Sequence, residues 1–121
     1  MKKLLITLLL ISPASFADWG DVYYCQMTSF STANLEGERT DVPLQKFQFK
    51  LDKTKKAMVF GKGGYLDDRE LEIRKGTIFK SKEEWYAGDK YSMAFFGKGK
   101  FIYSLTGSAG GNFMTANCDK F

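Results

Sequence analysis

Hydrophobic and polar residues alternate along most of the chain with the two-residue period of half-buried β-strands. The clearest segment is 45–51, in which Phe47, Phe49 and Leu51 take one face and polar residues take the other. The same alternation recurs at 70–74, where apolar side chains stand between charged neighbours. Both segments predict strands that bury one face and solvate the other.

Short apolar or alternating runs predict further strands. They lie at 20–29, 56–61, 77–80, 90–97, 100–107 and 112–118. The segment 81–89 is ambiguous, because Ser81 and Glu84 have the spacing of a helix capping box, whereas Trp85 and Tyr86 favour a strand. Only a few residues precede Gly88, so we favour a short strand. The longest predicted loop runs over about 30–43.

Seven to nine short strands with a turn signal about every 8–12 residues are typical of a small antiparallel β-meander. The fold class is therefore all-β, with a closed or partly open barrel favoured and a β-sandwich as the alternative. Inward-pointing side chains, among them Phe47, Phe49, Met93 and Phe95, are expected to fill most of a barrel interior. A shallow pocket at one mouth then fits better than a large internal cavity.

The N-terminus has the layout of a secretory signal peptide. Lys2 and Lys3 precede an apolar run at 4–11, and small residues end the segment at Ala17. The run is much shorter than the ~20 residues that span a bilayer. We therefore expect residues 1–17 to be cleaved, residues 18–121 to form a single β-rich domain without a stable membrane anchor, and a periplasmic or secreted location.

Two cysteines, Cys25 and Cys118, lie near the two ends of the mature chain. In an exported protein an even pair indicates a disulfide. A loop of this length predicts roughly 4–5 kcal/mol of stabilisation in the chain-entropy description. Because bonded cysteines need Cα atoms within about 7 Å, the first and last strands must lie close together. An up-and-down barrel brings those strands side by side, which favours the barrel over the sandwich.

The charge pattern gives no indication of a nucleic-acid partner. Without Lys2 and Lys3 the formal net charge falls from +4 to +2, and lysines are scattered among carboxylates. Nucleic-acid-binding domains usually concentrate basic residues on one face.

The chain contains no histidine. This removes the usual general base, the histidine-assisted nucleophiles and the common zinc sites, so we expect no enzyme activity, no metal and no cofactor. Carboxylate chemistry is a less favoured alternative, since a small hydrolase needs two carboxyl groups facing across a cleft. The carboxylates that lie close in sequence are Asp67, Asp68, Glu70, Glu72, Glu83 and Glu84.

The stretch 60–70, FGKGGYLDDRE, resembles an ion or phosphate site at first sight. Phosphate loops open a helix, however, and here a strand pattern follows. The acidic spacing of an EF-hand calcium loop is also absent. The glycines instead indicate a hairpin, with Lys62, Asp67 and Asp68 as the residues to examine for an ion.

Aromatic residues are plentiful, with 11 Phe, 6 Tyr and 2 Trp. A set that does not fit inside one alternation is expected in part at the surface, as candidate ligand-binding residues: Trp19, Tyr24, Trp85, Tyr86 and Phe96. The favoured function is a non-enzymatic exported binding module for an unidentified small molecule or protein. It would use an aromatic-rich surface or the barrel mouth. A structural or protein-interaction role at the cell envelope is the alternative.

Overall fold

The computed structural model describes residues 17–74 and 84–121. Residues 1–16, the expected strand at 77–80, Ser81 and Glu83 lie outside this part of the chain. The described residues form nine strands: β1 (Val22–Asn34), β2 (Arg39–Asp41), β3 (Lys46–Asp52), β4 (Ala57–Phe60), β5 (Glu70–Arg74), β6 (Glu84–Gly88), β7 (Ser92–Gly97), β8 (Lys100–Gly107) and β9 (Gly110–Lys120). No helix in these residues is long and apolar enough to cross a membrane.

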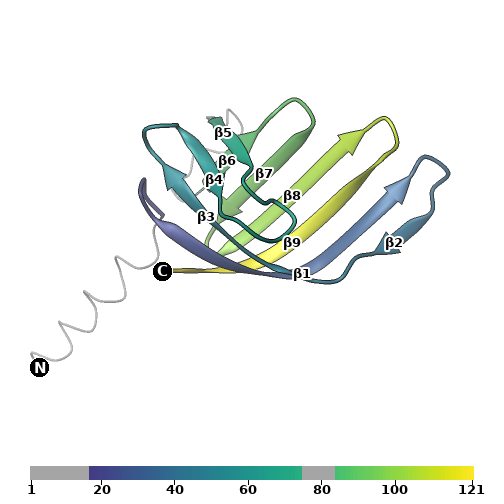
Figure 1. Ribbon diagram of the computed structural model, residues 1–121, viewed down its shortest axis with the longest axis horizontal. Coiled ribbons are helices and arrows are strands. Elements are labelled where there is room, and N and C mark those ends of the chain that lie inside the picture. Colours follow the sequence, from purple (N-terminus) through teal and green to yellow (C-terminus); the bar gives the residue numbers. More distant parts are fainter. Residues whose placement is uncertain (1–16, 75–83) are drawn as a thin grey trace, which may run out of the picture.

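The strands form a closed antiparallel barrel. Each strand from β3 to β8 pairs with the next in sequence, and β1 pairs with both β3 and β9 (Figure 1). Eight strands therefore close the barrel, and the three-residue β2 pairs with the distal part of β1, on the side opposite β9. The predicted all-β barrel is confirmed, and the sandwich alternative is excluded.

The predicted disulfide is also confirmed. Cys25 on β1 and Cys118 on β9 are direct cross-strand partners whose sulfur atoms are bonded, and they are separated by 93 positions in the sequence. The bond joins the first and last strands of the barrel, where an open meander would have two free edges.

Aromatic side chains fill the barrel interior. Phe47, Phe49 and Leu51 point inward, as predicted, and pack with residues from the strands on the other side of the barrel. The largest buried side chains also include Phe60, Phe96, Phe101 and Tyr103. Phe49 lies at the centre of this cluster, with its ring centroid 5.1 Å from that of Phe96 and 5.5 Å from that of Phe101.

The predicted inward orientation of Met93 and Phe95 is wrong. On β7 the buried residues before the terminal Gly97 are Ser92, Ala94 and Phe96, whereas Met93 is 50% exposed and Phe95 is only partly buried. Ala94 stands beside the large Tyr103 in the barrel wall, and Ala87 of β6 stands beside Ala94. Small residues are needed there because large ones on the other strands already occupy the interior.

The predicted loop at 30–43 is largely wrong as well. β1 continues to Asn34 and β2 occupies Arg39–Asp41, so the connection between them is a short turn. Thr28 is an extra residue in β1 relative to β9, and beyond this bulge the two strands extend past the short strands (Figure 1). From Ser31 to the end of β1 at Asn34 no residue is fully buried, so this part lacks the alternation that would have identified it as a strand.

Candidate functional site

The outer surface of strands β6–β9 carries a continuous group of apolar side chains, the wall patch: Tyr86, Met93, Phe95, Ile102 and Phe113. Phe95 stands between Tyr86 and Ile102 in the hydrogen-bonded ladder, and the Tyr86 and Phe95 rings are 5.1 Å apart. One row along, Met93 and Phe113 flank Ser104. The five side chains therefore form two adjacent rows on one face of the sheet.

The wall patch is exposed to solvent. Met93 is 50% exposed, Phe113 49% and Ile102 37%, while Tyr86 and Phe95 are partly buried. These side chains face outward because the alternating residues of the same strands, such as Phe101, Tyr103 and Met114, fill the core. Single exposed apolar residues are ordinary on proteins, but contiguous groups mark interaction surfaces.

Charge is distributed unevenly around the barrel wall. The exposed positions of β3 and β5 include Lys46, Lys50, Glu70, Glu72 and Arg74. Outward neighbours within the wall patch are instead the uncharged Ser104 and Thr115. At its border Lys100 Nζ donates a 2.7 Å hydrogen bond to Asn117 Oδ1. An uncharged, aromatic- and methionine-rich centre is the composition that distinguishes protein interfaces from ordinary surface.

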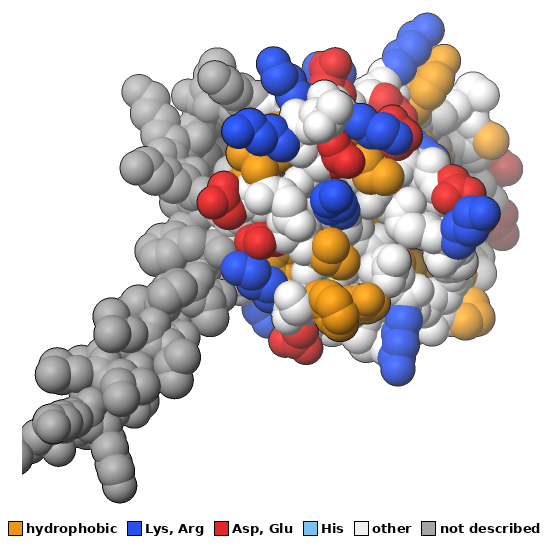
Figure 2. Space-filling view, turned by 60° about the vertical axis from the view of Figure 1, so that its left-hand side comes forward, with side chains coloured by type: hydrophobic (Ala, Val, Ile, Leu, Met, Phe, Trp, Pro, Cys, Tyr) orange, Lys and Arg blue, Asp and Glu red, His pale blue; other side chains and the backbone are white. Residues whose placement is uncertain are grey.

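Basic and acidic side chains are interspersed over the face seen in Figure 2, with hydrophobic side chains between them. This face has no large area of a single sign. Long-range attraction of a highly charged partner needs such an area.

The five aromatic residues singled out by sequence lie at separate places. Tyr86 belongs to the wall patch, and Phe96 is a core residue that is 1% exposed. The rings of Trp19 and Trp85 meet edge to face near the start of β1, with centroids 5.0 Å apart. Trp85 Nε1 is buried and has no hydrogen-bond partner in the part of the chain that the structure describes. Tyr24 is exposed on β1 and packs on Phe121. They do not form one site.

Sequence reasoning missed four members of the wall patch: Met93, Phe95, Ile102 and Phe113. Met93 and Phe95 were assigned to the wrong face of β7. For β8 a signal was present, because Phe101, Ile102 and Tyr103 are consecutive apolar residues. Such a run indicates a strand with apolar side chains on both faces, whereas a barrel core requires them on only one face.

The glycine-rich stretch 60–70 forms the β4–β5 hairpin and closes one end of the barrel. This is the end where β1 ends and β9 begins, and we call it the flared end. The connection 61–69, which we call the plug, inserts Leu66 into the core, where it is 1% exposed. Tyr65 packs on Phe30 and accepts a hydrogen bond from the Asn112 side chain of β9. Gly64 has φ of 85°, and an added Cβ would lie 2.9 Å from a backbone oxygen, so glycine is required there.

The aspartates of this connection contribute to the structure of the turn. Gly63 N–H donates a 2.7 Å hydrogen bond to Asp67 Oδ1, and Asp68 adopts a positive φ of 56°. Lys62 is exposed. Within residues 17–74 and 84–121, no three or more acidic or cysteine side chains are grouped in a way that could hold a metal ion.

Beside this plug lies a shallow groove of about 460 Å³. Its walls come from the tips of two hairpins and include Thr32, Asn34, Thr40, Leu105 and Asn112. Asn112 Oδ1 is buried and has no hydrogen-bond partner within residues 17–74 and 84–121. A buried amide oxygen without a partner is unfavourable by about 1–3 kcal/mol, which a polar ligand or a water molecule would offset.

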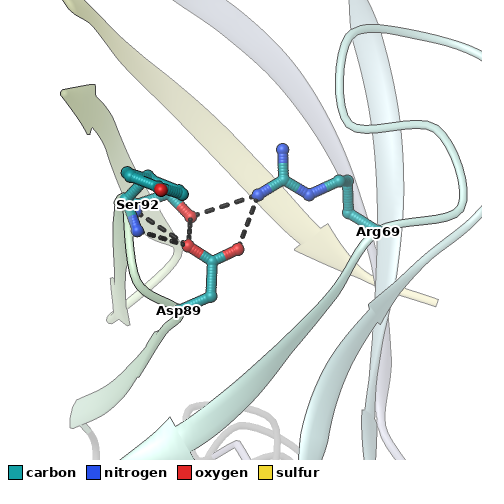
Figure 3. A network of polar contacts seen from close by, with 4 residues as sticks. Arg69, Asp89 and Ser92 are labelled. Atoms are coloured by element: carbon teal, nitrogen blue, oxygen red, sulfur yellow. Dashed lines mark hydrogen bonds and ion pairs between the residues drawn. The ribbon is translucent and has the colours of Figure 1, made fainter. Parts of the chain in front are cut away.

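An ion pair links the plug to the β6–β7 turn (Figure 3). Arg69 Nη2 lies 2.9 Å from Asp89 Oδ2, while Asp89 Oδ1 accepts hydrogen bonds from Ser92 Oγ and from the backbone N–H groups of Tyr91 and Ser92. Desolvation acts to raise the pKa of Asp89, but these hydrogen bonds and Arg69 outweigh it and lower the pKa to about 2. The carboxylate is thus fixed in its charged form.

The other carboxylates considered for acid–base chemistry are separated. Glu70 forms an ion pair with Lys55 at 2.9 Å, and Glu72 is exposed on β5. Glu84 is on β6, opposite Gly97.

Comparisons with protein-family models, with curated proteins and with solved structures find no match for this chain.

Proposed function

We propose that the mature protein is an exported, non-catalytic binding module that docks another protein on the wall patch. The observation that carries this proposal is the contiguity of Tyr86, Phe95 and Ile102 in one row, with Met93 and Phe113 in the next, on an uncharged part of the surface. Exposed apolar area of this kind is retained where another surface covers it.

The shape of the surface favours a protein over a small molecule. The wall patch lies on the outside of a closed barrel, where the sheet is convex, whereas small ligands bind in concave sites that cover most of their area. Aromatic and methionine side chains at the centre of a patch are also the usual energetic centre of protein interfaces.

Export is part of the proposal. The signal-peptide pattern at 1–17 supports it, and the Cys25–Cys118 disulfide is compatible with an extracytoplasmic compartment. The absence of histidine from the sequence supports a non-catalytic role. Glu70 is engaged in an ion pair and Asp67 in the turn, which also supports a non-catalytic role.

Photo-crosslinking in cells that export the protein tests this function. A photoactivatable phenylalanine analogue replaces Phe113 in one variant and Tyr24 in a matched control, since these rings are 49% and 45% exposed. We expect a discrete crosslinked protein from position 113, and its loss when Met93→Lys is added. Equal products from both positions, or none from position 113, would contradict the proposal.

The groove at the flared end supports a second candidate function, the binding of a small neutral polar molecule at the barrel mouth. Its carrying observation is Asn112, which lines the groove and whose buried Oδ1 has no hydrogen-bond partner among the described residues. Native mass spectrometry of protein purified from its own compartment tests it. A bound molecule that is lost in Asn112→Leu supports this function, and protein of unliganded mass in both forms argues against it.

A further inference from the structure

We infer that the protein docked on the wall patch is a second copy of this chain, related by a two-fold axis that runs along the strands between β7 and β8. The inference rests on the proposed function and names its partner. It comes from the order of large and small residues across β6–β9. When this order is laid against the same order reversed, larger side chains face smaller ones. A two-fold contact requires this property, because each copy offers the same surface to the other.

The row through Phe95 shows the pattern. In the order β6, β7, β8, β9 it contains Tyr86, Phe95, Ile102 and Thr115. Rotation about the axis places β6 of one copy over β9 of the other and β7 over β8. Tyr86 then lies over the smaller Thr115 of the second copy, and Phe95 lies over Ile102.

The next row follows the same rule. It contains Gly88, Met93, Ser104 and Phe113. The axis places Phe113 of one copy over Gly88 of the other, and Met93 over Ser104. The Met93 sulfur already lies beside Gly88, where an added Cβ would be 3.5 Å from it. Gly88 itself is buried, so the Phe113 ring of the second copy meets the Met93 sulfur, a favourable contact for an aromatic side chain.

Charge is complementary in the third row, which borders the patch. It contains Glu84, Gly97, Lys100 and Asn117. The rotation places Lys100 over Gly97 and Glu84 over Asn117 of the second copy. Since Asn117 Oδ1 accepts a hydrogen bond from Lys100 Nζ of its own chain, Glu84 comes close to the opposite charge on the second copy.

The area predicts a weak dimer. Four strands at about 4.8 Å and three outward rows at about 6.6 Å give a footprint of roughly 400 Å² in projection. Stable complexes bury about 800 Å² of accessible surface per partner, so a dissociation constant in the micromolar range or weaker is expected. The curvature of the barrel limits close contact to β7 and β8, with Tyr86 and Phe113 reaching across the wider gap at the sides.

Sedimentation equilibrium of the mature, disulfide-bonded protein tests the inference over about 1 µM to 1 mM. We expect the mass to rise from one chain to two. Met93→Lys and Phe113→Lys should each weaken association by about tenfold or more, because they place a charge in the apolar centre. Tyr24→Lys, an equally exposed ring outside the patch, should leave association unchanged. Thermal unfolding verifies that each variant is folded.

A charge exchange tests the orientation of the two copies. Glu84→Lys alone and Lys100→Glu alone should each weaken the dimer, and the double variant should restore it. Failure of the double variant to restore association would exclude this axis, and a single-chain mass throughout the concentration range would exclude the second copy as partner. In the latter case a crosslink from position 113 to a different protein would leave the proposed function standing.

Discussion

Cys25 and Cys118 stand directly opposite each other on β1 and β9, with their Cα atoms 4.0 Å apart. The bond between them links the two strands whose pairing closes the nine-strand meander into a barrel. Tyr23 and Met27 of β1 and Ala116 of β9 are buried beside it. The covalent link and the closing of the core therefore coincide in the fold.

Removal of this disulfide should destabilise the barrel. We expect Cys25→Ala/Cys118→Ala to lower the free energy of unfolding by about 2–5 kcal/mol, because the unfolded chain gains the freedom of a very long loop. Urea unfolding of the variant, compared with the oxidised wild type, measures the difference. Reduction of the wild type should give a similar loss, and equal midpoints for all three forms would contradict the prediction.

The fold class and its closure could be predicted because they depend on local patterns and one covalent constraint. Alternation identified strands such as β3, and the signal-peptide pattern at 1–17 predicted that Cys25 and Cys118 form a bonded pair. Alternation alone did not determine which face of β7 is buried. Met93 and Phe95 are more hydrophobic than Ser92 and Ala94, yet the interior has room only for the smaller set beside Tyr103.

The candidate site could not be predicted for a related reason. The wall patch joins residues of four strands, and its contiguity depends on a register that sets Phe95 beside both Tyr86 and Ile102. A one-residue change of register would move every one of these side chains to the other face. The sequence shows an excess of aromatic residues, but only the pairing shows which of them gather on one surface.

The plug at the flared end should contribute strongly to stability. Leu66 is 1% exposed among core residues, so Leu66→Ala is expected to lower the free energy of unfolding by about 2–5 kcal/mol through lost burial and a residual cavity. Leu35→Ala is the matched control, because Leu35 is 73% exposed in the β1–β2 turn. Chemical denaturation should separate the two variants. Equal stabilities would show that the connection 61–69 does not act as a plug.

Asp89 should stabilise the protein in a pH-dependent way. Asp89→Ala removes the turn hydrogen bonds and the Arg69 ion pair, so we expect a loss of about 1–2 kcal/mol near neutral pH. The folded state lowers the pKa of Asp89 to about 2. The stabilisation is therefore present above the ordinary aspartate pKa of about 4 and is lost as the pH falls through about 2.

Thermal unfolding of wild type and Asp89→Ala between pH 7 and about pH 2 measures this effect. Asp41→Ala is a suitable control, because the Asp41–Arg39 contact is 3.4 Å long and both side chains are more than two-thirds exposed, at 79% and 71%. Exposed pairs of this kind contribute little. A difference between wild type and Asp89→Ala that stays constant down to pH 2 would contradict the assigned role of the carboxylate.

Tyr23 should make the barrel sensitive to alkali. Its side chain is 5% exposed, and burial, with a smaller contribution from the Asp21 carboxylate, raises its pKa from 10.0 to about 12. The folded state therefore holds the neutral phenol, while the unfolded chain ionises near pH 10. The stability that this group contributes is complete below pH 10 and is lost as the pH rises toward 12, at up to about 1.4 kcal/mol per pH unit.

Tyr23→Phe keeps the ring and removes the ionisable group. The free energy of unfolding of this variant should fall less steeply than that of the wild type between about pH 10 and 12, as measured by urea unfolding at each pH. Tyr24→Phe, which alters an exposed ring on the same strand, should follow the wild type. Burial also raises the pKa of Tyr103, so a smaller alkaline loss should persist in Tyr23→Phe. Parallel curves for wild type and Tyr23→Phe would mean that the Tyr23 phenol ionises as readily in the barrel as in the unfolded chain.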